Sequence, residues 1–189
     1  MTERAGRLAG YRHRRDHFFA EHPHSPLREP QRAGFAGLDY FPERADLALN
    51  LPLDESGPEV GEAVEIPTSD GKAKSFSRVG RIRFDIDGEP AELTVFKDSD
   101  RGSLFIPFRD ASAGRDTYEA GRYLEPQARP DGTLDVDFNY AYNPFCAYGE
   151  GWSCPIPPEE NRLAVTIAAG EKAFTSPEDT MSGSAALSD

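Results

Sequence analysis

The stretch Arg81-Ile-Arg-Phe-Asp-Ile-Asp87 decides the fold class, because apolar and charged residues alternate along it without a break. Successive side chains of a strand point to opposite faces of a sheet, so the three apolar side chains share one face and the charged ones share the other. The dipeptide Asp87-Gly88 then favours the tight turn of a β-hairpin. We therefore expect a half-covered strand here, with residues 91–97 returning beside it.

Short apolar runs separated by turn residues continue this pattern in both directions. No helical pattern alternates with these runs, so consecutive strands are expected to pair antiparallel. The further predicted strands are residues 64–66, 73–76, 104–108, 117–124, 134–142 and 163–167. The predicted fold is therefore mainly β, an antiparallel barrel or sandwich.

An N-terminal α-helix is predicted over residues 3–22. Residues at spacings of three and four form one partly apolar stripe: Leu8, Tyr11, Arg15, Phe18 and His22. Pro23 ends the helix, because proline cannot continue the hydrogen-bonded turns. Since the stripe is short and partly polar, we expect the helix to pack across the β-structure rather than inside its core.

The length of 189 residues allows one domain with a sizeable core and no need of disulfides. We expect residues 1–172 to form a single β-rich domain. Residues 173–189 are small, polar and acidic, and they are predicted to form a disordered tail.

The charge balance excludes some classes of partner. The chain carries 33 acidic residues against 21 basic ones, a formal net charge of −12. Binding to nucleic acid or to an anionic membrane requires basic surface, so neither partner is expected. Excess acid with few lysines is typical of a protein adapted to a salt-rich cytoplasm, although a GC-rich genome alone also favours arginine over lysine.

Targeting signals are missing from the sequence as it stands. No apolar leader opens the chain and no run approaches 18 apolar residues, so a cytoplasmic protein without a membrane span is predicted. In a cytoplasm, Cys146 and Cys154 are expected to be thiols rather than a disulfide.

The most unusual segment is irregular and rich in aromatic residues, side-chain amides, cysteines and prolines. It reads Asp137-Phe-Asn-Tyr-Ala-Tyr-Asn-Pro-Phe-Cys-Ala-Tyr148 and continues as Cys154-Pro-Ile-Pro-Pro-Glu-Glu-Asn161. Such a loop is costly to order, because prolines cannot donate backbone hydrogen bonds and the remaining polar groups need partners. We therefore expect it to form part of a site.

A series of motifs stands in order through the second half of the chain. They are Leu104-Phe-Ile-Pro-Phe-Arg-Asp110, Thr117-Tyr118, Gly121-Arg-Tyr-Leu124, Asp137-Phe-Asn-Tyr-Ala-Tyr-Asn-Pro144, Cys146-Ala-Tyr148, Cys154-Pro155, Pro157-Pro158, Glu160-Asn161 and Ala169-Gly-Glu-Lys172. This set resembles the DUF1684 family of uncharacterised bacterial and archaeal proteins. Larger bacterial members carry a longer first half with a Gly-Trp-Leu type motif, which residues 22–40 replace here. The resemblance implies no established activity.

Arginine offers a planar fork that suits carboxylate or phosphate groups. Arg109 and Arg122 lie close together in the sequence of this acidic chain. They could form the floor of an anion pocket, with Tyr118 and Tyr123 near its rim. Alternatively, a hairpin between the predicted strands 117–124 and 134–142 would make Arg122 the partner of Asp135 or Asp137 in a structural ion pair.

Several other polar residues are candidates for ligand binding. The amides could contact a polar substrate, or they could satisfy stranded backbone groups of the loop. These further candidates are Asn139, Tyr142, Asn143, Cys154, Glu160 and Asn161.

Cys146 admits three interpretations. As a nucleophile it needs a nearby base, and all histidines lie between residues 13 and 24, so the N-terminal segment would have to fold over the loop. A zinc site would join both cysteines to His22 and His24, although the spacing is unusual for zinc. Otherwise the cysteines are two buried thiols, or one labile disulfide that fixes the loop.

Two functions from different classes follow. The first is binding of a small polar or anionic ligand in a pocket between the Arg109 loop and the Asn143–Cys154 loop. The alternative is a hydrolase that uses Asp110, Asp137 or Cys146 in the same pocket. The sequence has no glycine-rich phosphate loop and no nucleophile elbow, so we expect no cofactor and no metal and favour binding.

Overall fold

The computed structural model of the protein describes residues 3–176. Its strands are β1 (Ala48–Pro52), β2 (Ala63–Pro67), β3 (Ala73–Ile86), β4 (Glu89–Asp98), β5 (Leu104–Phe108), β6 (Arg122–Leu124), β7 (Gln127–Ala128) and β8 (Thr133–Asp137). Its helices are α1 (Glu3–Glu21) and α2 (Glu29–Ala33), with short 3₁₀ turns η1 (Ala45–Leu47), η2 (Phe138–Tyr140), η3 (Phe145–Ala147) and η4 (Glu159–Asn161).

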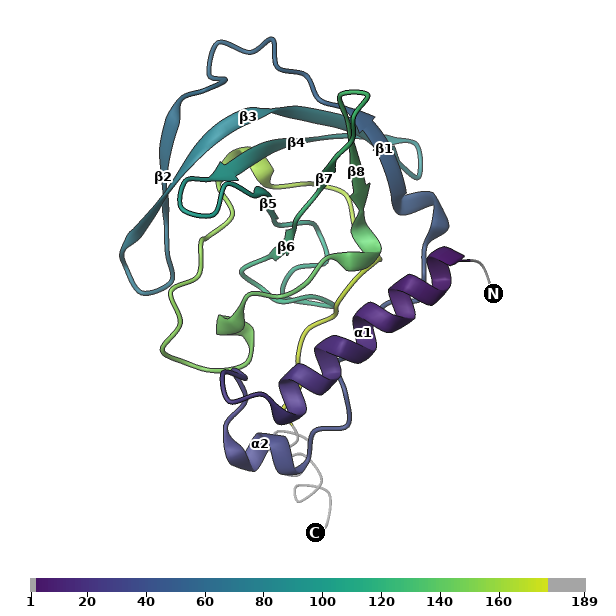
Figure 1. The fold of residues 1–189 in the computed structure, drawn as a ribbon, viewed down its shortest axis with the longest axis vertical. Coiled ribbons are helices and arrows are strands. Elements are labelled where there is room, and N and C mark those ends of the chain that lie inside the picture. Colours follow the sequence, from purple (N-terminus) through teal and green to yellow (C-terminus); the bar gives the residue numbers. More distant parts are fainter. Residues whose placement is uncertain (1–2, 177–189) are drawn as a thin grey trace.

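The strands form two antiparallel sheets. One has the order β1-β8-β7, and the other has the order β2-β3-β4-β5-β6 and curls into a half-barrel. Helix α1 runs diagonally across the lower part of the molecule in Figure 1. The predicted fold class, mainly β and antiparallel with an N-terminal helix, is confirmed.

The β3–β4 hairpin forms where the alternating stretch predicts it. Ile86 pairs with Glu89 across a two-residue turn. Asp87 and Gly88 adopt the positive φ angles of 53° and 91° that such a turn requires. Ile82 and Ile86 are buried on the inner face of the sheet, as the alternation predicts.

Strand β3 also joins the two sheets. It runs as one strand through the predicted segment 73–76, with a bulge between Arg78 and Gly80. At the bulge, Asp54 just beyond β1 pairs with Arg81 in an isolated bridge. A Cβ at Gly80 would lie 2.6 Å from the Asp54 carbonyl oxygen, so only glycine allows the two backbones to approach this closely.

Hydrophobic side chains gather in three clusters. The main core lies between the sheets and includes Ile82, Leu93, Val95, Ile106, Phe108, Val136, Phe138 and Ile167. On the other face of the five-stranded sheet, alternate residues of its strands form a second cluster of Ile66, Phe76, Phe96, Phe105 and Tyr123. Helix α1 contributes Phe19 to a third cluster with Leu27, Leu38 and Tyr148.

Two predicted strands are shorter than expected. Of residues 117–124 only β6 is a strand, because the carbonyl oxygen of Ser112 accepts hydrogen bonds from the three amides at residues 115–117 and so closes a turn. Of residues 134–142 only β8 is a strand. The Asp137 carboxylate accepts a hydrogen bond from the Asn139 amide (3.0 Å) and turns the chain into η2.

The predicted strand at residues 163–167 does not form. The Ile167 amide donates to Asp110 Oδ2 (2.7 Å), and the Ile167 carbonyl accepts from Arg122 Nη2 (2.8 Å). Because side chains take these backbone groups, they are not free to pair in a sheet. Arg122 accordingly pairs with Asp110 rather than with Asp135 or Asp137. Of the expected hairpin between residues 117–124 and 134–142, only the antiparallel bridge between Tyr123 and Tyr142 forms.

The C-terminal residues of the described part lie against the body of the protein. The Ala173 amide donates to the Asp116 carbonyl (3.0 Å), and the Phe174 ring lies 5.2 Å from the Tyr148 ring. The remainder of the predicted tail, residues 177–189, lies outside the described residues. Between residues 3 and 176, no helix has the length and apolar character needed to cross a bilayer.

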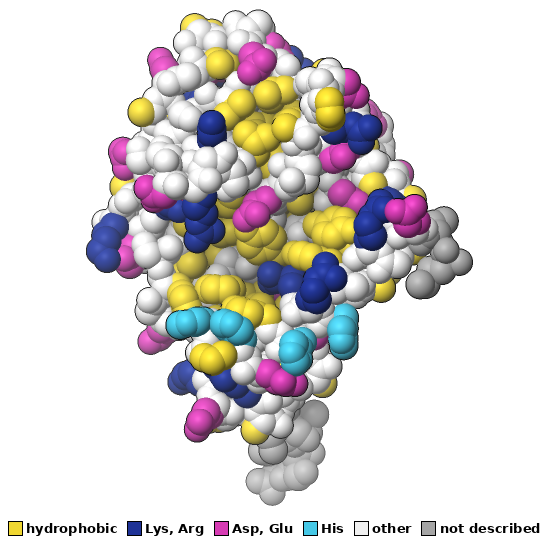
Figure 2. Space-filling model, viewed as in Figure 1, with side chains coloured by type: hydrophobic (Ala, Val, Ile, Leu, Met, Phe, Trp, Pro, Cys, Tyr) yellow, Lys and Arg dark blue, Asp and Glu magenta, His cyan; other side chains and the backbone are white. Residues whose placement is uncertain are grey.

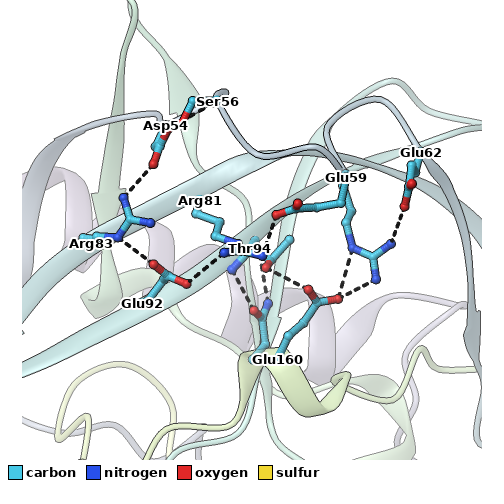
Figure 3. Close-up of polar contacts among 11 residues, drawn as sticks. Asp54, Ser56, Glu59, Glu62, Arg81, Arg83, Glu92, Thr94 and Glu160 are labelled. Carbon is cyan, nitrogen blue, oxygen red and sulfur yellow. Dashed lines mark hydrogen bonds and ion pairs between the residues drawn. The ribbon is translucent and has the colours of Figure 1, made fainter.

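A row of arginines covers the exposed face of β3 (Figure 3). Arg81 Nη2 lies 2.5 Å from Glu59 Oε1, and Arg83 bridges Asp54 and Glu92 at 2.6 Å each. Hydrogen bonds from Ser56 and Arg83 lower the pKa of Asp54 below its usual range. These charges remain in contact with solvent, so screening by salt limits what they contribute.

We expect Arg81→Gln to lower the free energy of unfolding by less than about 1 kcal/mol at low ionic strength, because exposed ion pairs contribute little. The effect should vanish in about 1 M NaCl, where the screening length is a few ångströms. Urea denaturation of both proteins at the two salt concentrations measures this. A loss of several kcal/mol that salt leaves unchanged would show that the row is a structural anchor.

Candidate functional site

An aromatic cleft lies between the five-stranded sheet and the irregular segment 142–155. It has a volume of about 410 Å³. The aromatic side chains that line it are Phe76, Phe105, Tyr123, Tyr142, Phe145 and Trp152. In the face shown in Figure 2, hydrophobic side chains gather down the middle of the molecule, with charged side chains mostly around them. We call this site the aromatic cleft.

The rings of the cleft divide into a floor and a wall. The floor belongs to the sheet, where Phe105 and Tyr123 are 9 % and 6 % exposed and their rings meet edge to face at 4.8 Å. The wall belongs to the irregular segment, where Tyr142, Phe145 and Trp152 are half-buried. The wall therefore has the aromatic surface that a ligand could still cover.

The wall is fastened at both ends to the sheet. Tyr142 and Tyr123 exchange two backbone hydrogen bonds of 2.8 and 3.0 Å. At the other end, the Ile156 amide donates to the Pro67 carbonyl (2.8 Å) and the Tyr123 hydroxyl donates to the Pro155 carbonyl (2.5 Å). The sheet thus positions the wall even though the wall contains no strand of its own.

A disulfide between Cys146 and Cys154 closes the wall into a loop. The expectation of two thiols is wrong. The physical reason is that both cysteines contact Ser69 in the β2–β3 turn. Ser69 exchanges two hydrogen bonds with the Cys154 backbone, and Ser69 Oγ lies 3.0 Å from Cys146 Sγ. The Cα atoms of the two cysteines are 6.5 Å apart, within the span of a disulfide.

Most charged side chains of the cleft form an ion pair or a hydrogen bond with another side chain. Lys74 Nζ pairs with Asp98 Oδ2 at 2.6 Å. Burial acts to raise the pKa of Asp98, but hydrogen bonds from Lys74 and two backbone amides outweigh it and lower that pKa. The Tyr142 hydroxyl donates to Glu125 Oε1 (2.7 Å). Arg101 is exposed and has no ion-pair partner among residues 3–176, so its guanidinium is available to a ligand.

Arg122 and Asp110 form a buried ion pair away from the cleft. Arg122 is fully buried and Asp110 is 4 % exposed, with 3.2 Å between Nη2 and Oδ1. The guanidinium also donates to the carbonyl oxygens of Ile167, Ala169 and Glu171. Burial lowers the pKa of Arg122, and the Asp110 carboxylate opposes this shift. Through these hydrogen bonds, the pair connects residues 167–171 to β6 and to the loop after β5.

Glu171 lies at the centre of a second buried polar group. Its carboxylate accepts hydrogen bonds from Arg15 (2.9 Å), from the Asn143 amide and side chain (3.3 and 3.2 Å), and from the Tyr148 hydroxyl. Burial raises the pKa of Glu171 to about 7, against the lowering effect of Arg15 and Asn143. Glu171 therefore joins helix α1 to the base of the cleft wall.

Of the residues that the sequence suggests for ligand binding, the structure brings four together at the aromatic cleft. These are Tyr123, Tyr142, Asn143 and Cys154. Arg109 lies elsewhere and donates to the Glu119 carbonyl (2.8 Å), and the half-buried Tyr118 follows the nearby turn. The predicted pocket between the Arg109 loop and the Asn143–Cys154 loop is thus displaced towards β3–β5.

The other predicted polar residues hold the chain in place. Asn139 exchanges two hydrogen bonds with the Arg44 backbone (2.8 and 2.7 Å). Asn161 does the same with Thr94 (2.7 and 2.9 Å) and also donates to the Pro107 carbonyl. Glu160 pairs with Arg78 at 2.9 Å. Of the catalytic candidates, Asp110 belongs to the buried ion pair with Arg122. Asp137 accepts the hydrogen bond from the Asn139 amide that ends β8.

The sequence patterns did not indicate the part of the cleft that the sheet forms, nor the arginine that lines it. Phe76, Phe105 and Arg101 come from β3, β5 and the turn between β4 and β5, and no local pattern connects them. Trp152 could have been found, because it is the sole tryptophan of the chain and stands in the glycine-rich stretch between the two cysteines.

A second cleft of about 590 Å³ lies where α1 meets β1 and β8. Its lining includes Arg4, Arg7, Tyr11, Leu49, Asp137 and Tyr140. Arg4 and Arg7 are both engaged in ion pairs, with Glu43 and Glu3. Within residues 3–176, no three His, Cys, Asp or Glu side chains are placed to hold a metal ion.

A family model described as "Protein of unknown function (DUF1684)" matches residues 33–172. The chain belongs to the DUF1684 family. The resemblance seen in the sequence is thereby confirmed. Every residue that lines the aromatic cleft falls inside the matched range, whereas α1 and its contribution to the second cleft fall outside it.

A solved structure is similar to this DUF1684 protein over nearly its whole length. It is the solution NMR structure of an uncharacterized protein from Haloarcula marismortui, with 39% sequence identity and a TM-score of 0.66. The similarity covers 89% of this chain and 93% of that chain. No curated protein matches the sequence.

Proposed function

We propose that this DUF1684 protein binds a small molecule with a flat apolar body and an anionic group in the aromatic cleft. One observation carries the proposal: three half-buried rings of the wall face a cleft that also holds Arg101, which has no ion-pair partner in the described part of the chain. Aromatic rings favour stacked or edge-on contact with flat apolar groups. A volume of about 410 Å³ suits a ligand of a few tens of atoms or fewer.

The charge of the cleft supports an anionic group on the ligand. The whole chain carries −12, which repels anions from most of its surface. In the cleft, Lys74 and Arg101 balance Asp98 and Glu125. Since Lys74 and Asp98 neutralise each other and Glu125 is bound by Tyr142, Arg101 is the charge that remains to select a ligand.

The hydrolytic alternative has less support. Asp110 is almost fully buried and bound by Arg122, Ser112 and the Ile167 amide, so a substrate has no path to it. Cys146 is part of a disulfide, which has no thiolate to act as a nucleophile. Binding without chemistry therefore explains more of the site.

Two dyes test this proposal. 8-Anilinonaphthalene-1-sulfonate (ANS) has a flat aromatic body and a sulfonate, and N-phenyl-1-naphthylamine has nearly the same body without charge. Arg101→Gln should weaken ANS binding about threefold, the size of an exposed ion pair, and leave the neutral dye unaffected. Trp152→Ala should weaken both dyes about tenfold, because it removes stacking area. Fluorescence titration gives the dissociation constants.

Arg115→Gln is the matched control, because Arg115 is also exposed but lies outside the cleft and pairs with Asp116. It should change neither dissociation constant. Equal weakening of ANS by Arg101→Gln and Arg115→Gln would refute the assignment of the anionic group to Arg101. Failure of the wild-type protein to bind either dye would refute the cleft as a ligand site.

A further inference from the structure

We propose that the Cys146–Cys154 disulfide is a reversible redox site that controls ligand binding in the aromatic cleft. The proposal rests on the proposed function, because it concerns the affinity of the same site. It follows from where the disulfide lies: Phe145 immediately precedes the closed loop and Trp152 lies inside it, and both supply accessible surface of the wall.

Few contacts other than the disulfide hold Trp152 in position. Its ring meets the Phe145 ring edge to face at 4.8 Å, and its carbonyl accepts a hydrogen bond from Ser69 Oγ (2.9 Å). Gly149 and Gly151 precede it and offer no side chains to pack. Ser153 Oγ donates to Asp70 Oδ1 (2.9 Å), and apart from this bond and the one at the Trp152 carbonyl, the order of residues 149–153 depends on the cross-link.

The neighbouring residues have independent anchors. Tyr148 is 3 % exposed and its hydroxyl donates to Glu171, so the chain is held just before the glycines. Phe145 packs against Phe18 and Phe19 of α1, with ring centroids 6.2 Å apart in both pairs. Reduction is therefore expected to release Trp152 while the floor and the Phe145 side of the wall stay in place.

The same anchors make the reaction reversible. Cys154 stays bound to Ser69, because the Ser69 amide donates to the Cys154 carbonyl (2.9 Å) and the Cys154 amide donates to Ser69 Oγ (3.1 Å). Cys146 stays in η3 between Phe145 and Tyr148. The two sulfurs are thus kept close after reduction, and the loop that must close again is short. A short loop costs little entropy to close, so the disulfide re-forms readily.

The partner reaction is thiol–disulfide exchange with a dithiol reductant. Cys146 is half-buried and Cys154 is 9 % exposed, so the reductant thiolate attacks Cys146 Sγ. A mixed disulfide forms at Cys146, the Cys146–Cys154 bond breaks, and Cys154 leaves as a thiolate. The second reductant thiolate then attacks the reductant sulfur of the mixed disulfide and releases Cys146. The dithiol is oxidised by two electrons, and its two protons end on the cysteines.

The sole tryptophan makes this measurable without a label, because all indole emission comes from Trp152. The protein is reduced with dithiothreitol, the free thiols are counted, and ANS is titrated into oxidised and reduced protein. We expect the reduced form to bind ANS about tenfold more weakly, because a ligand must then order the released wall. Trp152 emission should shift to longer wavelength, and reoxidation should restore both values.

Cys146→Ser combined with Cys154→Ser is the control variant. It should bind ANS as weakly as the reduced protein and should not respond to dithiothreitol. Far-UV circular dichroism checks that reduced protein and variant keep the sheet; if the variant does not fold, the reduced wild-type protein decides.

Equal ANS affinity of the oxidised and reduced forms would overturn the redox proposal and leave the proposed function intact. The redox proposal also fails if dithiothreitol cannot reduce the folded protein. Absence of ANS binding by the oxidised protein would overturn both proposals.

Discussion

Asp110→Ala is expected to lower the free energy of unfolding by about 3–5 kcal/mol, the usual cost of removing one partner from a buried ion pair. The substitution leaves the fully buried Arg122 guanidinium without its only carboxylate partner within residues 3–176. It also leaves the Ile167 amide and the Ser112 hydroxyl without the acceptor they now share. The loss of a buried counter-charge is the largest of these effects, because the interior solvates an ion poorly.

Guanidinium chloride denaturation of Asp110→Ala and wild type measures this change. Asp135→Ala is the matched control, because Asp135 pairs with Arg129 in an arrangement in which both side chains are about half exposed. The control should lose no more than about 1 kcal/mol. Similar small losses in both variants would mean that Arg122 finds other partners, and the pair would not be an anchor.

This experiment also separates the two roles considered for Asp110. If Asp110 carries chemistry in a pocket, its replacement should abolish an activity and leave the free energy of unfolding nearly unchanged. If it anchors the C-terminal segment, the ANS affinity of the folded variant should stay close to that of wild type, because Asp110 does not line the aromatic cleft.

Glu171→Gln is expected to lower the free energy of unfolding by about 1–3 kcal/mol near pH 5, where the folded protein holds Glu171 protonated, because the amide leaves buried hydrogen-bonding groups unsatisfied. Near pH 8 the loss should be smaller, because ionisation has by then removed the contribution of Glu171 from wild type. Gln keeps the size of the side chain, so no cavity contributes. The carboxylate now accepts from four donors on Arg15, Asn143 and Tyr148. An amide accepts through one oxygen only, and its NH₂ group would face these donors.

Glu171 also makes stability depend on pH. Its pKa is raised from 4.5 to about 7 by burial, so between these values the folded protein holds a proton that the unfolded chain has released. The contribution of Glu171 is therefore complete below about pH 4.5 and is lost as pH rises to about 7, a change of about 3 kcal/mol. Above pH 7 both states are ionised and the contribution stays constant.

Urea denaturation between about pH 5 and 8 tests both effects. Wild type should lose stability across this range through Glu171, and Glu171→Gln should remove that part of the slope. Glu3→Gln is the control on α1, because Glu3 is exposed and pairs with Arg7, which keeps its charge throughout this range, so the profile should stay unchanged. A wild-type stability that rises from pH 5 to 7 in step with Glu171 ionisation would contradict the assignment.

The local parts of this fold follow from short sequence patterns. Alternation from Arg81 to Asp87 and the Asp87-Gly88 turn predict the β3–β4 hairpin, because side-chain direction in a strand and turn geometry depend on neighbouring residues. Helix α1 follows from its spacing and from Pro23 in the same way. Such features need no knowledge of distant parts of the chain.

The errors arise where a side chain from a distant segment takes over a backbone group. Residues 163–167 have the composition of a strand, but Asp110 and Arg122 bind the backbone of Ile167 and remove it from any sheet. The cysteines appear as thiols in sequence because spacing alone does not show that Ser69 draws both to one turn. In each case the deciding partner lies tens of residues away.

The sequence by itself determined a mainly β, antiparallel protein with an N-terminal helix, a DUF1684 family membership, and the irregular segment after residue 137 as the place to look for a site. These properties depend on local periodicity and on motifs in order. Only the tertiary structure decided which surface faces that segment and that its cysteines are joined. It also decided that Arg101 lies beside the segment, without an ion-pair partner among residues 3–176, whereas Arg109 and Arg122 lie elsewhere. Those outcomes depend on long-range packing, because packing decides whether an arginine stays exposed to solvent or is enclosed and ion-paired.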